Sequence, residues 1–134
     1  MLDPKLDPTK FFQSLDSYLK SNKITNYITL RRIISMIYFS LSNYIATEAF
    51  YRNKYTKEDI NANEIRQIII DCDFKLTDSW NFVSASRNLV DHHLQNPSNI
   101  LGRNLTVDFS RLIKTLNYAI TISNRIKEKL TDGS

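Results

Sequence analysis

The sequence predicts an all-α fold, an up-and-down four-helix bundle with an additional N-terminal helix, and three observations support this. The chain of 134 residues contains only 2 Gly and 3 Pro, and so few turn-forming residues favour long helices over sheets. Apolar residues recur at steps of three and four, as on one face of a helix. The links between these segments are short, which favours antiparallel neighbouring helices. The length fits a single domain over residues 1–134.

The first helix is expected to begin at Pro8 or Thr9 and to end near Lys20, after an extended N-terminus at residues 1–8. A second helix is indicated over residues 25–53, because no Gly or Pro interrupts it and it carries a broad apolar face. That face consists of Leu30, Ile33, Ile34, Ile37, Leu41, Tyr44 and Ile45. Many of these residues are poor helix formers, so we expect tertiary packing to stabilise the helix.

A third, shorter helix is expected over residues 56–73. Thr56 is a residue type that caps helices, and two acidic residues follow it in the first turn. Residues 61–63 are a candidate interruption of this helix.

Two further helices are expected in the last part of the chain. One runs from residues 76–77 to about 94, with Thr77 or Asp78 as its cap, and Pro97 predicts a loop after it. The last helix is expected over residues 106–130, with an inner stripe that includes Phe109, Leu112, Leu116 and Ile126, and residues 131–134 are expected to fray.

Charge and composition narrow the class of protein. The net charge of +4 is compatible with a polyanionic partner such as RNA, but the basic residues are spread along the chain. A single cysteine, Cys72, excludes an intrachain disulfide and any multi-cysteine metal site. Residues 1–10 lack the apolar stretch of a signal peptide, and no apolar run approaches the ~20 residues that span a bilayer. The sequence therefore predicts a cytoplasmic protein without membrane contact.

Polar and charged side chains gather near the end of the helix expected to finish at residue 94, in the run Arg87-Asn88-Leu89-Val90-Asp91-His92-His93. At about 100° per residue, Asn88 and His92 share one face of this helix, and Arg87 and Asp91 share another. Arg87 and His92 are then about 140° apart, so they can act together only where another element packs on that end of the helix.

The residue types of this segment suit the cleavage of RNA. A histidine titrates near neutral pH, so His92 is the candidate general acid or base. The Arg87 guanidinium can bind a phosphate and stabilise a pentavalent phosphorane, and Asn88 can orient the ribose or phosphate. RNA supplies its own nucleophile, the 2′-hydroxyl, and the segment has no carboxylate cluster. The set predicts metal-independent cleavage without a cofactor, with Asp91 and His93 in supporting roles.

The spacing of Arg87, Asn88 and His92 resembles the signature of the HEPN family of helical nucleases. That signature is an Arg followed, after four to six residues, by a His, and Asn directly after the Arg is a common variant. His92 fits it with four intervening residues and His93 with five. The resemblance covers this short motif, its place in the penultimate helix and the expected bundle.

The resemblance implies a bundle that forms homodimers, so that two motifs face each other in one composite cleft. It also implies an endoribonuclease acting as a toxin–antitoxin toxin or a phage-defence effector, with RNA as substrate and an antitoxin or regulatory protein as partner. One large branch of such toxins has Tyr two residues after the motif His, but this chain has Leu94 there. That departure weakens the expectation of a nucleotidyltransferase-like antitoxin.

These residues also have plainer interpretations. A helix C-terminus favours cations such as Arg87 and His92 through its dipole alone, and Asp91 can simply pair with Arg87 at i,i+4. Adjacent histidines point about 100° apart and are not expected to share a metal ion. Glu48 is expected at the solvated surface, with a place in the cleft as the alternative. The functional alternative is a non-catalytic HEPN-like helical module that binds a protein partner or a nucleotide, and an unrelated helical scaffold is a third interpretation.

Overall fold

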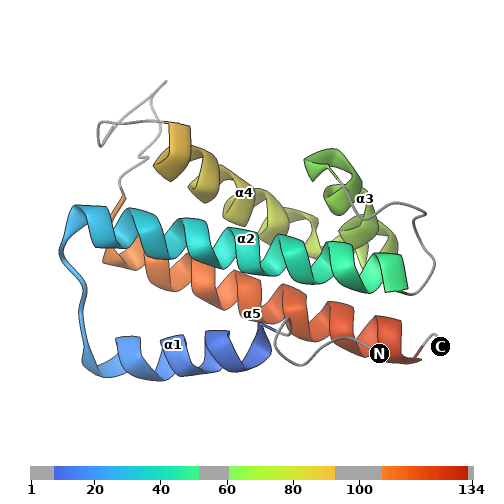
Figure 1. Ribbon diagram of the computed structural model, residues 1–134, viewed down its shortest axis with the longest axis horizontal. Coiled ribbons are helices and arrows are strands. Elements are labelled where there is room, and N and C mark those ends of the chain that lie inside the picture. The colour runs from blue at the N-terminus through green and yellow to red at the C-terminus, as the bar shows by residue number, and fades with distance from the viewer. Residues whose placement is uncertain (1–7, 52–60, 93–106, 133–134) are drawn as a thin grey trace.

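The computed structural model describes residues 8–51, 61–92 and 107–132, and these residues form helices packed together, with no strand among them. The elements are α1 (Thr9–Ser21), α2 (Tyr27–Tyr51), α3 (Ala62–Cys72), the 3-10 turn η2 (Phe74–Leu76), α4 (Thr77–His92) and α5 (Phe109–Asp132). The longer helices α1, α2, α4 and α5 alternate in direction along the chain, and the short α3 packs at one end (Figure 1). The predicted all-α class is confirmed.

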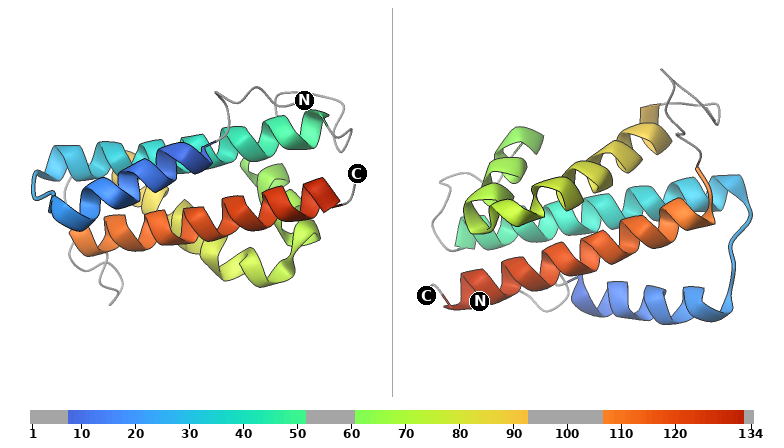
Figure 2. Two further views of the ribbon diagram at one scale, coloured as in Figure 1. Left: turned by 90° about the horizontal axis from the view of Figure 1, so that it is seen from below. Right: turned by 180° about the vertical axis from the view of Figure 1, so that it is seen from behind.

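Helices α2, α4 and α5 contact one another, and α1 packs against α5; the right view of Figure 2 shows α2 between α4 and α5. The predicted apolar face of α2 is confirmed: six of its seven members are buried, and Ile33 is partly buried. Trp80 of α4 is also buried, and its ring stacks on Tyr38 of α2 with the ring centroids 5.5 Å apart. Trp80 therefore packs in the core.

The packing of α2 in the core predicts that shortening one of its buried side chains lowers the stability of the fold strongly. Leu41 is fully buried at the centre of this helix, so Leu41→Ala removes buried apolar atoms and leaves a cavity. We expect the free energy of unfolding to fall by about 2–5 kcal/mol. Urea unfolding followed by circular dichroism measures it, and Asn43→Ala, an exposed position on the same helix, should change it by less than about 0.5 kcal/mol. Equal effects of the two substitutions would contradict the burial of Leu41.

Helix α1 begins at Thr9, as predicted, whereas the start of α3 differs from the prediction because a side-chain cap sets it. Asn61 caps α3, since its Oδ1 accepts a hydrogen bond from the Glu64 amide while the Glu64 carboxylate accepts one from the Asn61 amide. The expected interruption at residues 61–63 is therefore the start of a helix. The expected cap Thr56 lies outside the described residues.

Helix α4 begins at Thr77, as predicted, but its predicted cap and the predicted start of α5 were wrong. The carboxylate of Asp73 accepts from the Lys75 amide and caps η2, which leads directly into α4, so neither Thr77 nor Asp78 is the first cap. Helix α5 begins at Phe109 rather than near residue 106, because the carboxylate of Asp108 accepts from the backbone amide of Arg111.

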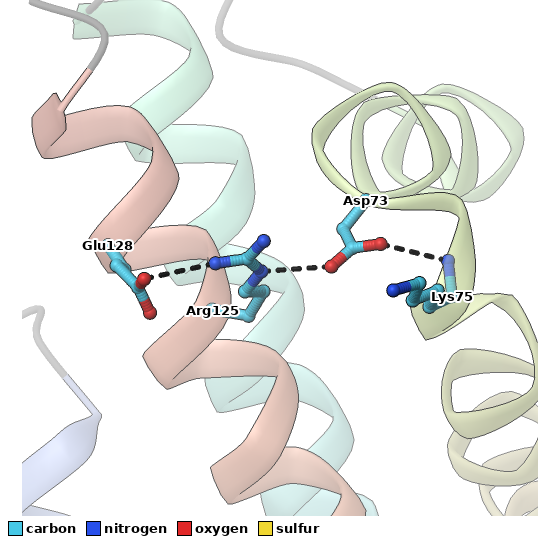
Figure 3. Close-up of polar contacts among 4 residues, drawn as sticks. All are labelled: Asp73, Lys75, Arg125 and Glu128. Carbon is cyan, nitrogen blue, oxygen red and sulfur yellow. Dashed lines mark hydrogen bonds and ion pairs between the residues drawn. The ribbon is translucent and has the colours of Figure 1, made fainter.

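Asp73 also joins the turn between α3 and α4 to α5 (Figure 3). Arg125 of α5 donates from Nε to Asp73 Oδ2 at 2.9 Å, and its Nη1 lies 3.0 Å from Glu128 Oε1. The hydrogen bond from Arg125, with a second from the Lys75 backbone, holds the pKa of Asp73 below its usual value of 3.8. This contact fixes the end of the molecule that is remote from the Arg87 segment.

The lowered pKa of Asp73 predicts a pH-dependent difference between the wild type and Arg125→Gln. A carboxyl group whose pKa is lower in the folded state stabilises the fold above its unfolded pKa, and this contribution is lost as the pH falls through the folded value. The variant should therefore be less stable at neutral pH, and the difference should shrink below about pH 3.8. Urea unfolding at a series of pH values tests this, with Lys129→Gln on the same helix as the control. A difference that stays constant into strong acid would rule out Asp73 as the partner that matters.

Candidate functional site

The Arg87 side chain lies between the C-terminal half of α4 and the N-terminal half of α2. Its guanidinium carbon is 5.2 Å from the ring centroids of both Tyr38 and Phe39. Its Nε is 3.0 Å from Asp91 Oδ2, and its Nη1 donates to Asn88 Oδ1 at 3.2 Å. Two aromatic rings and two polar neighbours thus define the position of this guanidinium.

Asp91 links the segment to α2. It forms the predicted i,i+4 ion pair with Arg87, and Ser35 Oγ of α2 donates a hydrogen bond to its Oδ2 at 3.3 Å. Both side chains of the ion pair are 26% exposed, so the pair lies at the rim of the packed interior. The plainer interpretation of Asp91, as the partner of Arg87, agrees with this geometry.

Arg31 of α2 supports the end of α4. It donates one hydrogen bond to the carbonyl oxygen of Val90 and another, of 2.8 Å, to the hydroxyl of Tyr27. The last carbonyl groups of a helix have no partner within the helix, and the negative end of its dipole favours a cation. Arg31 therefore ties the C-terminal turn of α4, which carries the motif, to α2.

The two histidines are described only in part. Asn88 is exposed, and His92 occupies the position four residues later, on the same side of α4 and at its last residue. The side chain of His92 and the whole of His93 lie outside the described residues. The structure thus brings together Arg87, Asn88 and Asp91, and it leaves the approach of an imidazole to Arg87 as a prediction.

An open groove of about 430 Å³ runs beside the motif between α2 and α4. Its lining consists of Ile28, Arg31, Arg32, Ser35, Met36, Phe39, Val90 and Asp91. The exposed apolar members Ile28, Met36 and Phe39 are 60%, 49% and 43% exposed, and two arginines line the groove with them. We call this surface the α2–α4 groove.

Sequence reasoning missed the contribution of α2 to this groove. The available signal was the pair Arg31-Arg32 within an otherwise apolar helix, followed by Met36 and Phe39 off the predicted buried face. The pairing of that face with the end of α4 follows from tertiary packing, which periodicity alone does not specify.

A second group of cations lies where α4 meets α5, and we call it the α4–α5 cluster: Phe82, Ser86, Arg111 and Lys114. The Arg111 guanidinium carbon and the Lys114 Nζ are each 5.1 Å from the centroid of the Phe82 ring. Arg111 Nη1 also donates to Ser86 Oγ at 3.0 Å, and Ser86 is fully buried. Burial lowers the pKa of Arg111, while the charge of Asp108 raises it.

Other sequence expectations have mixed outcomes. Glu48 is only 8% exposed, so the expectation of a solvated surface residue was wrong. It lies on the C-terminal half of α2 and does not line the α2–α4 groove.

Over the described residues, no group of three or more His, Cys, Asp or Glu side chains is arranged to hold a metal ion. None of the described helices is long and apolar enough to cross a membrane.

Comparison with known proteins gives no relative for this chain. No family model, no curated protein and no solved structure matches it. The function therefore has to be argued from the site itself.

Proposed function

We propose that this chain is a metal-independent endoribonuclease of the HEPN type, with an up-and-down four-helix bundle as its framework. Arg87 and His92 would be its catalytic residues. The observation that carries the proposal is the placement of the Arg87 guanidinium, which contacts Phe39 and Asp91 in the wall of an open groove that also holds two further arginines. A guanidinium fixed in this way can hold a phosphate and stabilise added charge on it.

The proposed reaction is a transesterification within RNA. The 2′-oxygen forms a bond to phosphorus, the bond from phosphorus to the 5′-oxygen breaks, and the products are a 2′,3′-cyclic phosphate and a 5′-hydroxyl. His92 takes the proton of the 2′-hydroxyl or gives one to the leaving 5′-oxygen. Arg87 stabilises the phosphorane, Asn88 positions it, and Asp91 and His93 support these groups.

The proposal includes a homodimer, because one chain offers one Arg87 and one His92. In a two-fold dimer the same surface is used by both copies, so two motifs can meet in one cleft and supply two imidazoles. The apolar residues Ile28, Met36 and Phe39 are exposed beside the motif, and their burial against a second copy would stabilise such a dimer. The α2–α4 groove is therefore the proposed dimer surface.

The test is incubation of the purified protein with RNA in the presence of a chelator. We expect cleavage that leaves 2′,3′-cyclic phosphate ends and does not depend on added metal. As a toxin or phage-defence effector, the protein should also arrest growth when it is expressed without its antitoxin or regulatory partner. Cleavage that stops when metal is removed would contradict the mechanism.

The alternative is a non-catalytic HEPN-like module that binds a protein partner or a nucleotide. The exposed apolar side chains of the α2–α4 groove favour it, since such a surface suits a binding partner without any catalysis. Failure of the wild type to cleave any RNA, together with binding to this groove, would favour this alternative.

A further inference from the structure

The α4–α5 cluster lies on the opposite flank of α4 from Arg87. Phe82 and Ser86 of α4 contact α5 side chains, whereas Arg87 contacts α2. The outer face of α4 between these two flanks carries the exposed Asn88, and His92 follows it one turn later. Figure 1 shows the C-terminal half of α4 above α2, and Figure 2 shows α5 beside them.

We propose that the α4–α5 cluster binds a second phosphate of a single-stranded RNA that crosses the outer face of α4. This inference rests on the proposed function, because it takes RNA as the polyanion and the Arg87 side of α4 as the place of cleavage. It adds a binding site away from the motif and specifies the strandedness of the substrate.

The electrostatics of the cluster favour an anion. Two cations, Arg111 and Lys114, each lie 5.1 Å from the centroid of the Phe82 ring, although like charges one helical turn apart repel each other. The Asp108 carboxylate, which accepts a hydrogen bond from the backbone amide of Arg111, offsets part of the charge of that residue. Arg111 is half-buried, and a charge in such surroundings is screened less by water than an exposed one. A phosphate placed between the two cations would relieve their repulsion.

The spacing of the two cationic flanks favours a single strand. They lie on either side of one α-helix, whose diameter with side chains is about 10–12 Å, so one phosphate cannot contact both. A single strand can bend over a ridge of this width, whereas a duplex is stiff over many base pairs. Phosphates of one strand that are separated by more than one nucleotide would then contact the cluster and Arg87, with the intervening sugar–phosphate backbone crossing near Asn88.

Lys114 provides the test, because its side chain is exposed while its ammonium group lies over the Phe82 ring. The binding of a short fluorescein-labelled single-stranded RNA is measured by anisotropy in chelator, over a range of salt concentrations. The protein is the full chain carrying His92→Ala, so that the RNA stays intact. Lys114→Glu is compared with Lys129→Glu, which makes the same charge change at an exposed position near the other end of α5.

We expect Lys114→Glu to weaken binding several-fold more than Lys129→Glu. It should also reduce the slope of log K against log salt by at least about 0.7, the value for one phosphate contact on a single strand. Equal affinities and equal slopes for the two variants would overturn the inference, as would stronger binding of a duplex of the same sequence. If the wild type cleaves no RNA but binding still depends on Lys114, the second phosphate site is supported and the proposed nuclease activity is refuted. If the wild type cleaves RNA but the two lysine variants bind RNA with equal affinity, the proposed nuclease is supported and the second phosphate site is refuted.

Discussion

Replacing His92 with alanine is expected to lower the rate of RNA cleavage by about 10²–10⁴-fold, the usual contribution of a general acid or base. Arg87→Ala should lower it by about 10²–10³-fold, because a preorganised donor to the phosphorane is lost. Single-turnover cleavage of a labelled RNA in chelator measures both effects. The chain has only two histidines, so little other imidazole remains to rescue the activity.

Matched controls make this result specific. His93→Ala changes the neighbouring imidazole, which points about 100° away on a helix, and its effect should be clearly smaller. Arg66→Ala removes a guanidinium that contacts Asn81 on the other half of α4, and it should leave cleavage unchanged. A larger loss for His93→Ala than for His92→Ala would assign catalysis to the five-residue spacing instead. Full activity of both histidine variants would end the nuclease proposal.

Met36→Glu is expected to convert a dimer to a monomer and to reduce cleavage in parallel. Met36 is 49% exposed in the α2–α4 groove, and a two-fold dimer through this surface would bring its new charge close to the other copy. The two copies of the new carboxylate would repel each other across the two-fold axis, and desolvating each of them costs several kcal/mol, which would weaken or dissociate the dimer. Sedimentation velocity at several concentrations, with cleavage measured on the same samples, gives both results.

Tyr18→Glu is the control for this substitution, because Tyr18 is an exposed aromatic residue on α1, away from the groove. It should leave both the mass and the cleavage rate unchanged. A wild type that is monomeric at every concentration and still cleaves RNA would refute the composite cleft. A dimeric Met36→Glu would place the interface on another face.

The sequence predicted which segments are helical and which residues form the core more accurately than it predicted where α3 and α5 begin. The stripe of α2 from Leu30 to Ile45 is repeated often enough for periodicity to identify its buried face. The start of α3 depends on one reciprocal pair of hydrogen bonds between Asn61 and Glu64. Asparagine residues are common in loops and caps alike, so their type alone did not show which role Asn61 has.

The sequence predicted those contacts of the candidate site that form within one helix, but not those between helices. The i,i+4 pair of Arg87 and Asp91 is present, because both residues belong to the same helix. The rings that flank Arg87 come from Tyr38 and Phe39, almost fifty positions earlier in the chain. Contacts at such separation depend on how α2 and α4 pack, and the apolar periodicity of each helix does not specify which face meets the other.

The confinement of Arg87 has a consequence for how tightly the chain can hold a ligand. A free arginine side chain has many rotamers, and fixing a flexible side chain on binding costs about 0.5–1.5 kcal/mol. Two rings, Asn88 and Asp91 already restrict this guanidinium in the unbound chain. Most of that rotameric entropy is therefore lost during folding, and a phosphate that reaches Arg87 meets a donor whose direction is set in advance.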